Sequence, residues 1–438
     1  MIKVKRNILV NLIFFLLLIS LEISSQEKTR KVFNFFGEIR FRYEYYDNFT
    51  LKGYSPNEID KLLLERIRLN FEFDLKEKGK IFIQLQDAHP FLTKFGESDF
   101  KTSNPIKDTI DIRQFYYEKN NINGGIIGFK FGRQQISYGD QRIFGPGNWG
   151  NTGRYAWDAV MININGSPLK SDLWFGKYLL YKSNVWPNHP VSKFLTFVNY
   201  NKVQNLPFSF DFFYVLKRNT SEKILSELNK KGNLTSHSIG FQMAKENIAS
   251  FNLGATFVYQ FGKHSQDLIK SYGYSAKIGY TFGTLNNMRI EVKYTFGSGD
   301  SNPKDGTYET FDGVFGGADL YYGFMNFFFW ANLRDFEINS LFNLKENFTV
   351  SFDYHKFLLS SNKDGWYLPS LTIQKRNLSE KSSTDIGNEF DLRFSYKTNE
   401  NFSFLWGISK FNPLRFIKEN YENYRNANWY YIQMVYSF

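Results

Sequence analysis

The chain has 438 residues, 42% of them hydrophobic, and a mean hydropathy of −0.41, which allows either several soluble domains or one large β-structure. It has no cysteine, which excludes a disulfide framework, a cysteine-based zinc site and a thiol nucleophile. The formal net charge of +11 and the pI of about 9.3 raise the question of a nucleic-acid partner.

The first predicted element is an export signal. Lys3, Lys5 and Arg6 form a basic start, and residues 8–19 form an apolar stretch. That stretch has the length of a signal-peptide core and is shorter than the ~20 residues that a membrane-spanning helix needs. The sequence therefore predicts a signal peptide at residues 1–25.

The remaining residues, 26–438, are predicted to form a single domain. Because an exported chain does not meet a genome, and because no helix-turn-helix or RNA-binding pattern is present, no nucleic-acid partner is expected. Aromatic residues make up 19% of the chain, and such a composition favours strands over helices.

Strict alternation of apolar and polar residues marks the strands. It is clearest at residues 37–45, 64–76, 288–296 and 387–396, and a period of two is typical of a strand with two different faces. These strands are about ten residues long, which suits a tilted strand crossing a bilayer, whereas strands of soluble proteins average ~5 to 6 residues.

The connections between the strands alternate in length. Eight short turns separate nine long polar stretches, near residues 47–60, 88–109, 136–154, 182–192, 218–235, 263–271, 298–332, 359–385 and 412–428. The last strand ends on Phe438, and a terminal aromatic residue is typical of outer-membrane barrels. The prediction is an all-β fold: a transmembrane, antiparallel, up-and-down β-barrel of about 18 strands with short periplasmic turns and long extracellular loops, in the outer membrane of a Gram-negative-type bacterium.

The polar faces of the strands are predicted to line the lumen, because a charge at the bilayer midplane costs roughly 2 to 4 kcal/mol. The basic residues on these faces are Arg40, Arg42, Arg66, Arg68, Arg113, Lys130, Arg289, Lys293 and Arg393. Guanidinium groups on a confined wall focus a positive potential and favour an anionic solute. Acids on the same faces leave open an alternative, a ladder of internal salt bridges that stiffens the wall.

The stretch from residue 132 to residue 160 combines cations, carboxylates and glycines between two strands. Glycines and Pro146 allow backbone excursions, so this loop can fold into the barrel. The charged residues expected at or just inside the mouth are Arg133, Asp140, Arg142, Arg154 and Asp158. The alternative is a plain solvent-exposed loop, in which surface ion pairs contribute little.

The same stretch carries a resemblance. Its pattern GRQ..SYGDQR..G.GNWGNTGRYAWDAV is similar to the signature of the alginate export family of outer-membrane barrels, and residues 298–328, 352–369 and 386–413 are similar in order and spacing. The resemblance spans most of the mature chain. It implies an eighteen-stranded monomeric barrel with an arginine-rich constriction that releases the acidic exopolysaccharide alginate, and it marks the five charged loop residues named above for testing.

We interpret the chain as an outer-membrane channel with a cationic lumen that passes an anionic polysaccharide, alginate-like, without a cofactor. The expected partners are that polysaccharide or an oligosaccharide, outer-membrane lipid and periplasmic export proteins. The first alternative is an uptake porin for small anionic solutes or oligosaccharides. The second is a non-conducting surface barrel that binds a partner through its loops.

Catalysis is not predicted. Some outer-membrane barrels are hydrolases, which need a serine, a histidine and a carboxylate or amide in proximity. The five histidines are His89, His189, His237, His264 and His355, and none lies in a Gly-x-Ser-x-Gly motif.

No metal is predicted as a cofactor. Asp300, Asn302 and Asp305 have the spacing of half a calcium loop, but Phe311 stands where a full loop would place its glutamate. A turn is the expected structure there, and external calcium is the alternative.

Overall fold

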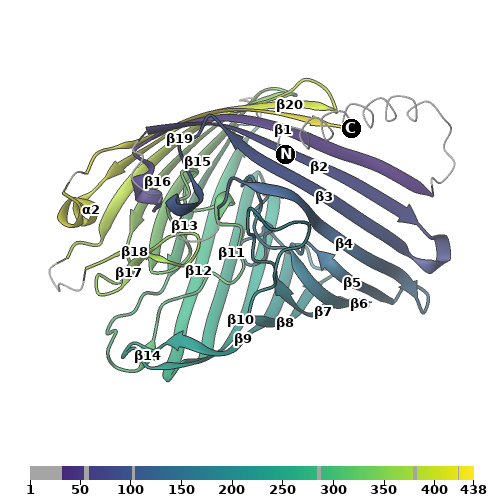
Figure 1. Cartoon of the computed structure of the whole chain (residues 1–438), viewed down its shortest axis with the longest axis horizontal. Coiled ribbons are helices and arrows are strands. Elements are labelled where there is room, and N and C mark those ends of the chain that lie inside the picture. The colour runs from purple at the N-terminus through teal and green to yellow at the C-terminus, as the bar shows by residue number, and fades with distance from the viewer. Residues whose placement is uncertain (1–31, 54–58, 101–103, 284–287, 378–381, 423) are drawn as a thin grey trace.

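The computed structural model describes residues 32–53, 59–100, 104–283, 288–377, 382–422 and 424–438. The predicted signal peptide lies outside these residues. Among the residues described, no helix is long and apolar enough to cross a membrane. The chain forms a closed antiparallel β-barrel of 18 strands (Figure 1), as the alternation predicts.

The wall consists of strands that pair with their neighbours along the chain. They are β1 (Phe33–Asp47), β2 (Ile59–Asp74), β3 (Lys80–Phe91), β4 (Asp108–Ile122), β5 (Ile127–Gln134), β6 (Trp157–Asn165), β7 (Leu169–Tyr178), β8 (Leu195–Val203), β9 (Ser209–Leu225), β10 (Lys231–Ile248), β11 (Phe251–His264), β12 (Asp267–Phe282), β13 (Met288–Gly297), β15 (Leu333–Lys345), β16 (Phe348–Leu358), β19 (Asp385–Lys397), β20 (Phe402–Pro413) and β21 (Ala427–Ser437). The barrel closes where β1 pairs with β21, from Glu38 opposite Ser437 to Asp47 opposite Asn428. This closure leaves no free sheet edge.

Short elements lie in the connections. The helical ones are η1 (Phe49–Lys52), η2 (Lys76–Lys78), η3 (Glu97–Asp99), η4 (Ala318–Leu320) and α2 (Arg415–Asn420). The strands are β17 (Gly365–Tyr367) and β18 (Ile373–Arg376), which form a hairpin, and β14 (Thr307–Tyr308), which pairs with β12 in parallel. Where the structure describes them, the short predicted turns join strands at one rim, called here the turn rim, and the other connections lie at the opposite loop rim. The predicted turn at residues 283–287 lies largely outside the described residues.

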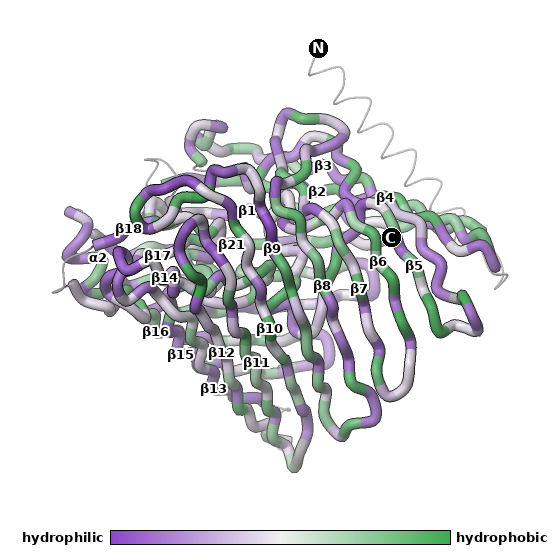
Figure 2. The backbone as a smooth tube through the Cα atoms, turned by 90° about the horizontal axis from the view of Figure 1, so that it is seen from below, coloured by the Kyte–Doolittle hydropathy of each residue, from purple (hydrophilic) through white to green (hydrophobic). Residues whose placement is uncertain are grey.

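The two faces of the wall differ as predicted. Figure 2 shows green apolar and purple polar residues alternating along the strands. In β12, for example, Tyr272 and Ile278 are exposed on the outer face while Ser271 and Ser275 are buried inside. Because the outer face of a barrel meets lipid and the inner face meets the lumen, this pattern fits a membrane-spanning wall.

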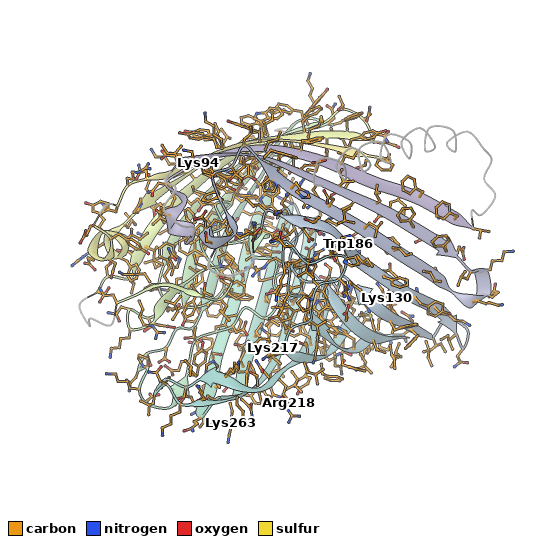
Figure 3. The ribbon with its side chains drawn as sticks, in the orientation of Figure 1. Lys94, Lys130, Trp186, Lys217, Arg218 and Lys263 are labelled. Carbon is orange, nitrogen blue, oxygen red and sulfur yellow. The ribbon has the colours of Figure 1, made fainter. Side chains whose placement is uncertain are left out.

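Two predicted long loops are wrong. The connections between β9 and β10 and between β11 and β12 are only residues 226–230 and 265–266. Polar residues such as Arg218 and Lys263 remain in the strands and project from the outer face (Figure 3). A strand that extends beyond the bilayer can carry polar residues on both faces. Such a strand end has the composition of a loop, although its backbone stays in the sheet.

Two long connections fold inside the barrel. Loop 135–156 and loop 298–332 meet where Phe144 pairs with Phe315, and both contribute to one buried aromatic core. Lys217 on the wall anchors loop 298–332, because its Nζ donates to Asp312 Oδ2 at 2.6 Å and to the Val314 carbonyl at 2.8 Å. Both loops therefore occupy part of the loop-rim half of the lumen.

The wall is incomplete beside loop 135–156. Strand β5 ends at Gln134, and its pairing with β4 reaches only from Ile122 to Phe115. Beyond that point a segment of loop 179–194 covers β4: the Ile112 amide donates to the Pro187 carbonyl at 3.1 Å. We call this place the β4 seam.

Candidate functional site

Five arginines form one sector of the inner wall. Arg40 and Arg42 lie on β1, Arg66 and Arg68 on β2, and Arg113 on β4, and all five are buried. The register places Arg40 directly opposite Arg66, and alternation turns all of them inward. We call these residues the arginine sector.

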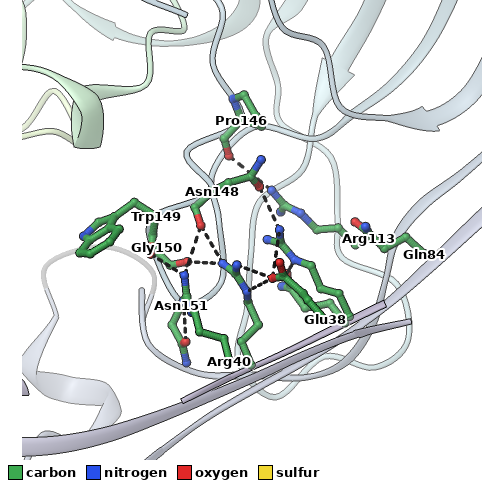
Figure 4. A network of polar contacts seen from close by, with 12 residues as sticks. Glu38, Arg40, Gln84, Arg113, Pro146, Asn148, Trp149, Gly150 and Asn151 are labelled. Atoms are coloured by element: carbon green, nitrogen blue, oxygen red, sulfur yellow. Dashed lines mark hydrogen bonds and ion pairs between the residues drawn. The ribbon is translucent and has the colours of Figure 1, made fainter. Parts of the chain in front are cut away.

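The arginine sector binds the backbone of loop 135–156 (Figure 4). Arg40 Nη1 donates to the Trp149 carbonyl at 3.0 Å and Arg66 Nη1 to the Asn148 carbonyl at 2.7 Å. Arg42 Nη1 donates to the Trp149 carbonyl at 2.9 Å, and Arg113 Nη2 to the Pro146 carbonyl at 3.4 Å. These acceptors are neutral, so they bind the guanidinium groups without cancelling their charge.

Few carboxylates balance the arginine sector. Among the described residues, Glu38 pairs with Arg66 at 2.5 Å and with Arg68 at 3.9 Å, and Glu44 pairs with Arg42 at 2.5 Å. The ion pairs of these arginines thus involve two carboxylates. Asp108 and Asp111 of β4 also act electrostatically on Arg113, and Coulomb interactions in such a confined space are stronger than in water.

Glycine allows the loop to approach the sector. Gly153 has φ of 75°, and a Cβ at this position would lie 2.4 Å from Arg113 Nη2. Gly147 has φ of 60° and would meet the stem of Arg154. Side chains at either residue would strain the backbone and push the loop off the wall.

Three of the four other predicted wall cations lie in ion pairs. Lys293 Nζ lies 2.7 Å from Glu337 Oε1, and Arg393 Nη2 lies 2.9 Å from Asp353 Oδ2. Arg289 Nε lies 3.5 Å from Glu291. On β13 to β19 the wall thus has the ladder of internal ion pairs that the sequence left open as an alternative.

Lys130 faces the lumen nearer the turn rim. Its Nζ lies 3.9 Å from the centroid of the Tyr116 ring, and it stands opposite Glu118 in the register of β4 and β5. It belongs to neither the arginine sector nor the ladder.

Arg133 and Asp158 do not lie at the inner mouth. They stand opposite each other on β5 and β6 and form a two-pronged pair, with Nε to Oδ1 at 2.8 Å and Nη2 to Oδ2 at 3.1 Å. They share the outer face with Phe131, which is 46% exposed. Arg133 also donates to Asn188 Oδ1 at 2.6 Å, so the pair reinforces the β4 seam from outside.

Asp140 and Arg142 lie inside the barrel, between the two inner loops. The Arg142 Cζ lies 3.9 Å from the ring centroid of Tyr321, and its Nη1 donates to the Tyr322 hydroxyl at 3.2 Å. Asp140 lies beside it, 3.7 Å from the Arg142 Nε. This arginine joins loop 135–156 to loop 298–332.

Two buried clusters contain residues that can ligate a metal ion. In the first, His189 Nε2 lies 3.0 Å from Asp108 and 3.6 Å from Asp111. The His189 Nδ1 accepts from the Lys182 amide, so Nε2 carries the proton and has no lone pair for a metal. This cluster instead fixes loop 179–194 to β4.

The second cluster contains Asp335, Glu337 and His355. His355 Nδ1 lies 3.0 Å from Asp335, and the ammonium group of Lys293 already neutralises Glu337. The residues of this cluster therefore form part of the ladder of ion pairs on the wall.

The calcium candidate residues cap turns. Asp300 Oδ1 accepts from the Asn302 amide at 2.9 Å, and Asp305 Oδ1 accepts from the Thr307 amide at 2.8 Å. Asp300 is buried whereas Asp305 is exposed. This is the turn that the sequence favours, and calcium binding stays a prediction.

A cavity of about 660 Å³ opens at the loop rim beside the arginine sector. It is lined by basic residues including Lys52 and Arg154 and by aromatic residues including Trp149, Tyr155 and Tyr181. We call it the mouth cavity. The sequence predicted only Arg154 among these five, although Trp149 lies within the motif of the loop.

Comparison with known proteins bears on both fold and family. A family model for alginate export matches residues 32–431. No curated protein matches the sequence. The structure is similar to Acinetobacter baumannii OccAB4 (TM-score 0.60, 9% identity, 93% of this chain and 98% of that chain covered) and to Pseudomonas aeruginosa opdK (TM-score 0.60, 7% identity, 93% and 98% covered). It is also similar to P. aeruginosa OccK5 (TM-score 0.56, 10% identity, 93% and 98% covered). At such identities the likeness to these structures shows the barrel fold alone.

Proposed function

Because the chain belongs to the alginate export family and is an outer-membrane, porin-like barrel, we propose that it is a passive channel for an anionic polysaccharide. The observation that carries this proposal is the arginine sector, whose guanidinium groups bind neutral carbonyls of loop 135–156. An acidic polymer entering the lumen can exchange its carboxylates for these carbonyls, and carboxylates pair more strongly with guanidinium groups.

Passage requires that binding be favourable enough for entry and weak enough for release. The arginine sector meets the first requirement through its guanidinium charges. It meets the second because each guanidinium has carbonyl acceptors to return to when a carboxylate leaves. Directional movement then needs only a concentration gradient or a push from the periplasm, and no cofactor.

Ion selectivity tests this function. In a planar bilayer with a salt gradient across it, the purified protein is expected to give a reversal potential of the sign that marks anion preference, and a short oligouronate is expected to block the current. Block by small anions with no block by longer oligouronates would favour an uptake porin. Cation preference, or no current at all, contradicts the proposal.

Lys52 gives the selectivity a dependence on pH. Burial lowers the pKa of its ammonium group to about 8, although neighbouring Glu44 acts in the opposite direction. A lysine with a pKa near 8 loses most of its charge between pH 7 and pH 9, while uronates stay ionised. The anion preference is expected to fall over this range, and the variant Lys52→Met is expected to show a smaller change. Reversal potentials at both pH values measure it, and equal changes in the two proteins would contradict the role of Lys52.

A further inference from the structure

The mouth cavity combines features that suit one class of ligand. Its lining comes from loops that are far apart in the sequence, including loop 135–156, loop 179–194 and loop 298–332. Its volume of about 660 Å³ lies within the range of sites for small ligands. We propose that the mouth cavity binds acidic sugar units of the polymer. This inference rests on the proposed function and adds a binding site at the loop rim that shares only Arg42 with the arginine sector.

Arg154 supplies the anion-binding group. Its Nη2 donates to the Pro369 carbonyl, and its Cζ lies 5.3 Å from the ring centroid of Tyr155 and 5.8 Å from that of Phe329. These contacts hold the guanidinium in one orientation. Within the described part of the chain, its Nη1 is buried and has no hydrogen-bond partner. A fixed guanidinium with a free N–H is prepared to bind a carboxylate.

Other polar atoms of the cavity lack partners as well. Tyr181 Oη, Asn326 Oδ1 and Asp319 Oδ1 are buried, and none has a hydrogen-bond partner among the residues described. A buried polar group without a hydrogen-bond partner is destabilising. A hydroxyl-rich ligand supplies both donors and acceptors at such a wall, and a hydrocarbon ligand supplies neither.

Aromatic rings form the remaining walls. Trp149, Tyr155 and Tyr178 are partly exposed, and the rings of Tyr155 and Tyr178 meet edge to face with centroids 5.5 Å apart. Arg42 lies over the Trp149 ring at 4.4 Å and holds it at the cavity edge. The C–H faces of pyranose rings pack against such surfaces, while sugar hydroxyls reach the polar atoms between them.

The balance of charge selects acidic sugars over neutral ones. The basic residues of the cavity are Arg42, Lys52, Arg154 and Lys182, and its acids are Glu44 and Asp319. Glu44 already pairs with Arg42, and Asp319 Oδ2 accepts from the Trp149 amide at 3.0 Å. Cations therefore outnumber acids, and a ligand carboxylate is favoured.

Direct binding tests the site. Isothermal titration of the full-length barrel in detergent with a short oligomannuronate is expected to give saturable binding, and neutral oligomannose of equal length is expected to give none. The variant Arg154→Gln is expected to weaken binding about tenfold or more, since a hydrogen bond to a charged group is worth about 1.5 to 3 kcal/mol. Tyr181→Phe removes a single oxygen, so it tests the site with minimal risk to folding, and a several-fold loss is expected.

Arg415→Gln is the matched control, because Arg415 lies on α2 with its side chain 73% exposed and pairs only with Glu419 among the described residues. Its affinity is expected to equal that of the unmodified protein. Equal binding of the neutral oligomer, or unchanged affinity in both cavity variants, overturns the inference.

Reversal potentials of the same proteins separate the two proposals. The unmodified protein is expected to show both anion preference and oligouronate binding. Anion preference without oligouronate binding overturns the mouth site alone. Binding without anion preference overturns the channel function, and with it the transport role assigned to the site.

Discussion

Replacing Arg40, Arg66 and Arg68 together by glutamine is expected to raise the single-channel conductance several-fold and to lower the anion preference. Arg40 and Arg66 donate to the backbone carbonyls of Asn148, Trp149 and Gly150. Arg68 donates to the side-chain Oδ1 of Asn148 at 3.2 Å. Hydrogen bonds with a charged donor contribute about 1.5 to 3 kcal/mol each. Without them loop 135–156 loses its hold on β1 and β2, and the lumen widens while its positive charge falls.

Glu38→Gln separates the two effects. Glu38 pairs with Arg66 and Arg68 and does not touch the loop through any hydrogen bond among the described residues. Removing its charge is expected to increase the anion preference and to leave the conductance near that of the unmodified protein. If the arginine variant shows altered selectivity at unchanged conductance, loop 135–156 does not obstruct the path.

The variant Trp330→Ala is expected to release loop 298–332 from the wall. Trp330 is 1% exposed, its Nε1 donates to the Phe296 carbonyl at 2.8 Å, and its ring lies 4.9 Å from that of Phe311. Truncating a buried tryptophan to alanine costs about 3 to 5 kcal/mol. The expected result is a lower thermal midpoint and faster proteolytic cleavage within the loop.

Trp186→Ala is the control for this prediction. Trp186 is 62% exposed on the connection between β7 and β8, and exposed substitutions usually change stability by less than about 0.5 kcal/mol. Equal effects of the two variants would mean that burial of Trp330 does not hold the loop.

The wall could be predicted because each strand repeats one physical rule. A charge in the bilayer core is costly, so polar and apolar residues take opposite faces and a residue's position in the alternation predicts its face. That rule was available for Arg133 as well: it shares its phase with Phe129 and Phe131, and it faces outward with them. The glycine-rich motif that follows suggested a mouth residue, and the strand phase was the better guide.

The inner loops could not be predicted from residue types. The groups that bind the arginine sector are backbone carbonyls of residues 146–150, which every sequence possesses. The mouth cavity brings Lys52, Trp149 and Asn326 together from three separate loops, and no local pattern encodes such a meeting. The sequence predicts that the wall arginines point into the lumen, but it does not predict which carbonyl groups accept their hydrogen bonds.

The β4 seam is the part of the wall where we expect the barrel to open most easily. Between β10 and β11 the ladder runs from Leu234 to Lys245 without interruption, whereas at the seam one backbone hydrogen bond among the described residues, from the Ile112 amide, joins β4 to loop 179–194. The remaining contacts there, such as Arg133 with Asn188 and His189 with Asp108, involve side chains. Opening free energy varies within a structure according to local hydrogen bonding and packing. We therefore expect lateral tension in the bilayer to open the barrel first at this seam. Hydrogen–deuterium exchange is expected to be faster at the amides around Ile112 than at those of the continuous β10–β11 ladder.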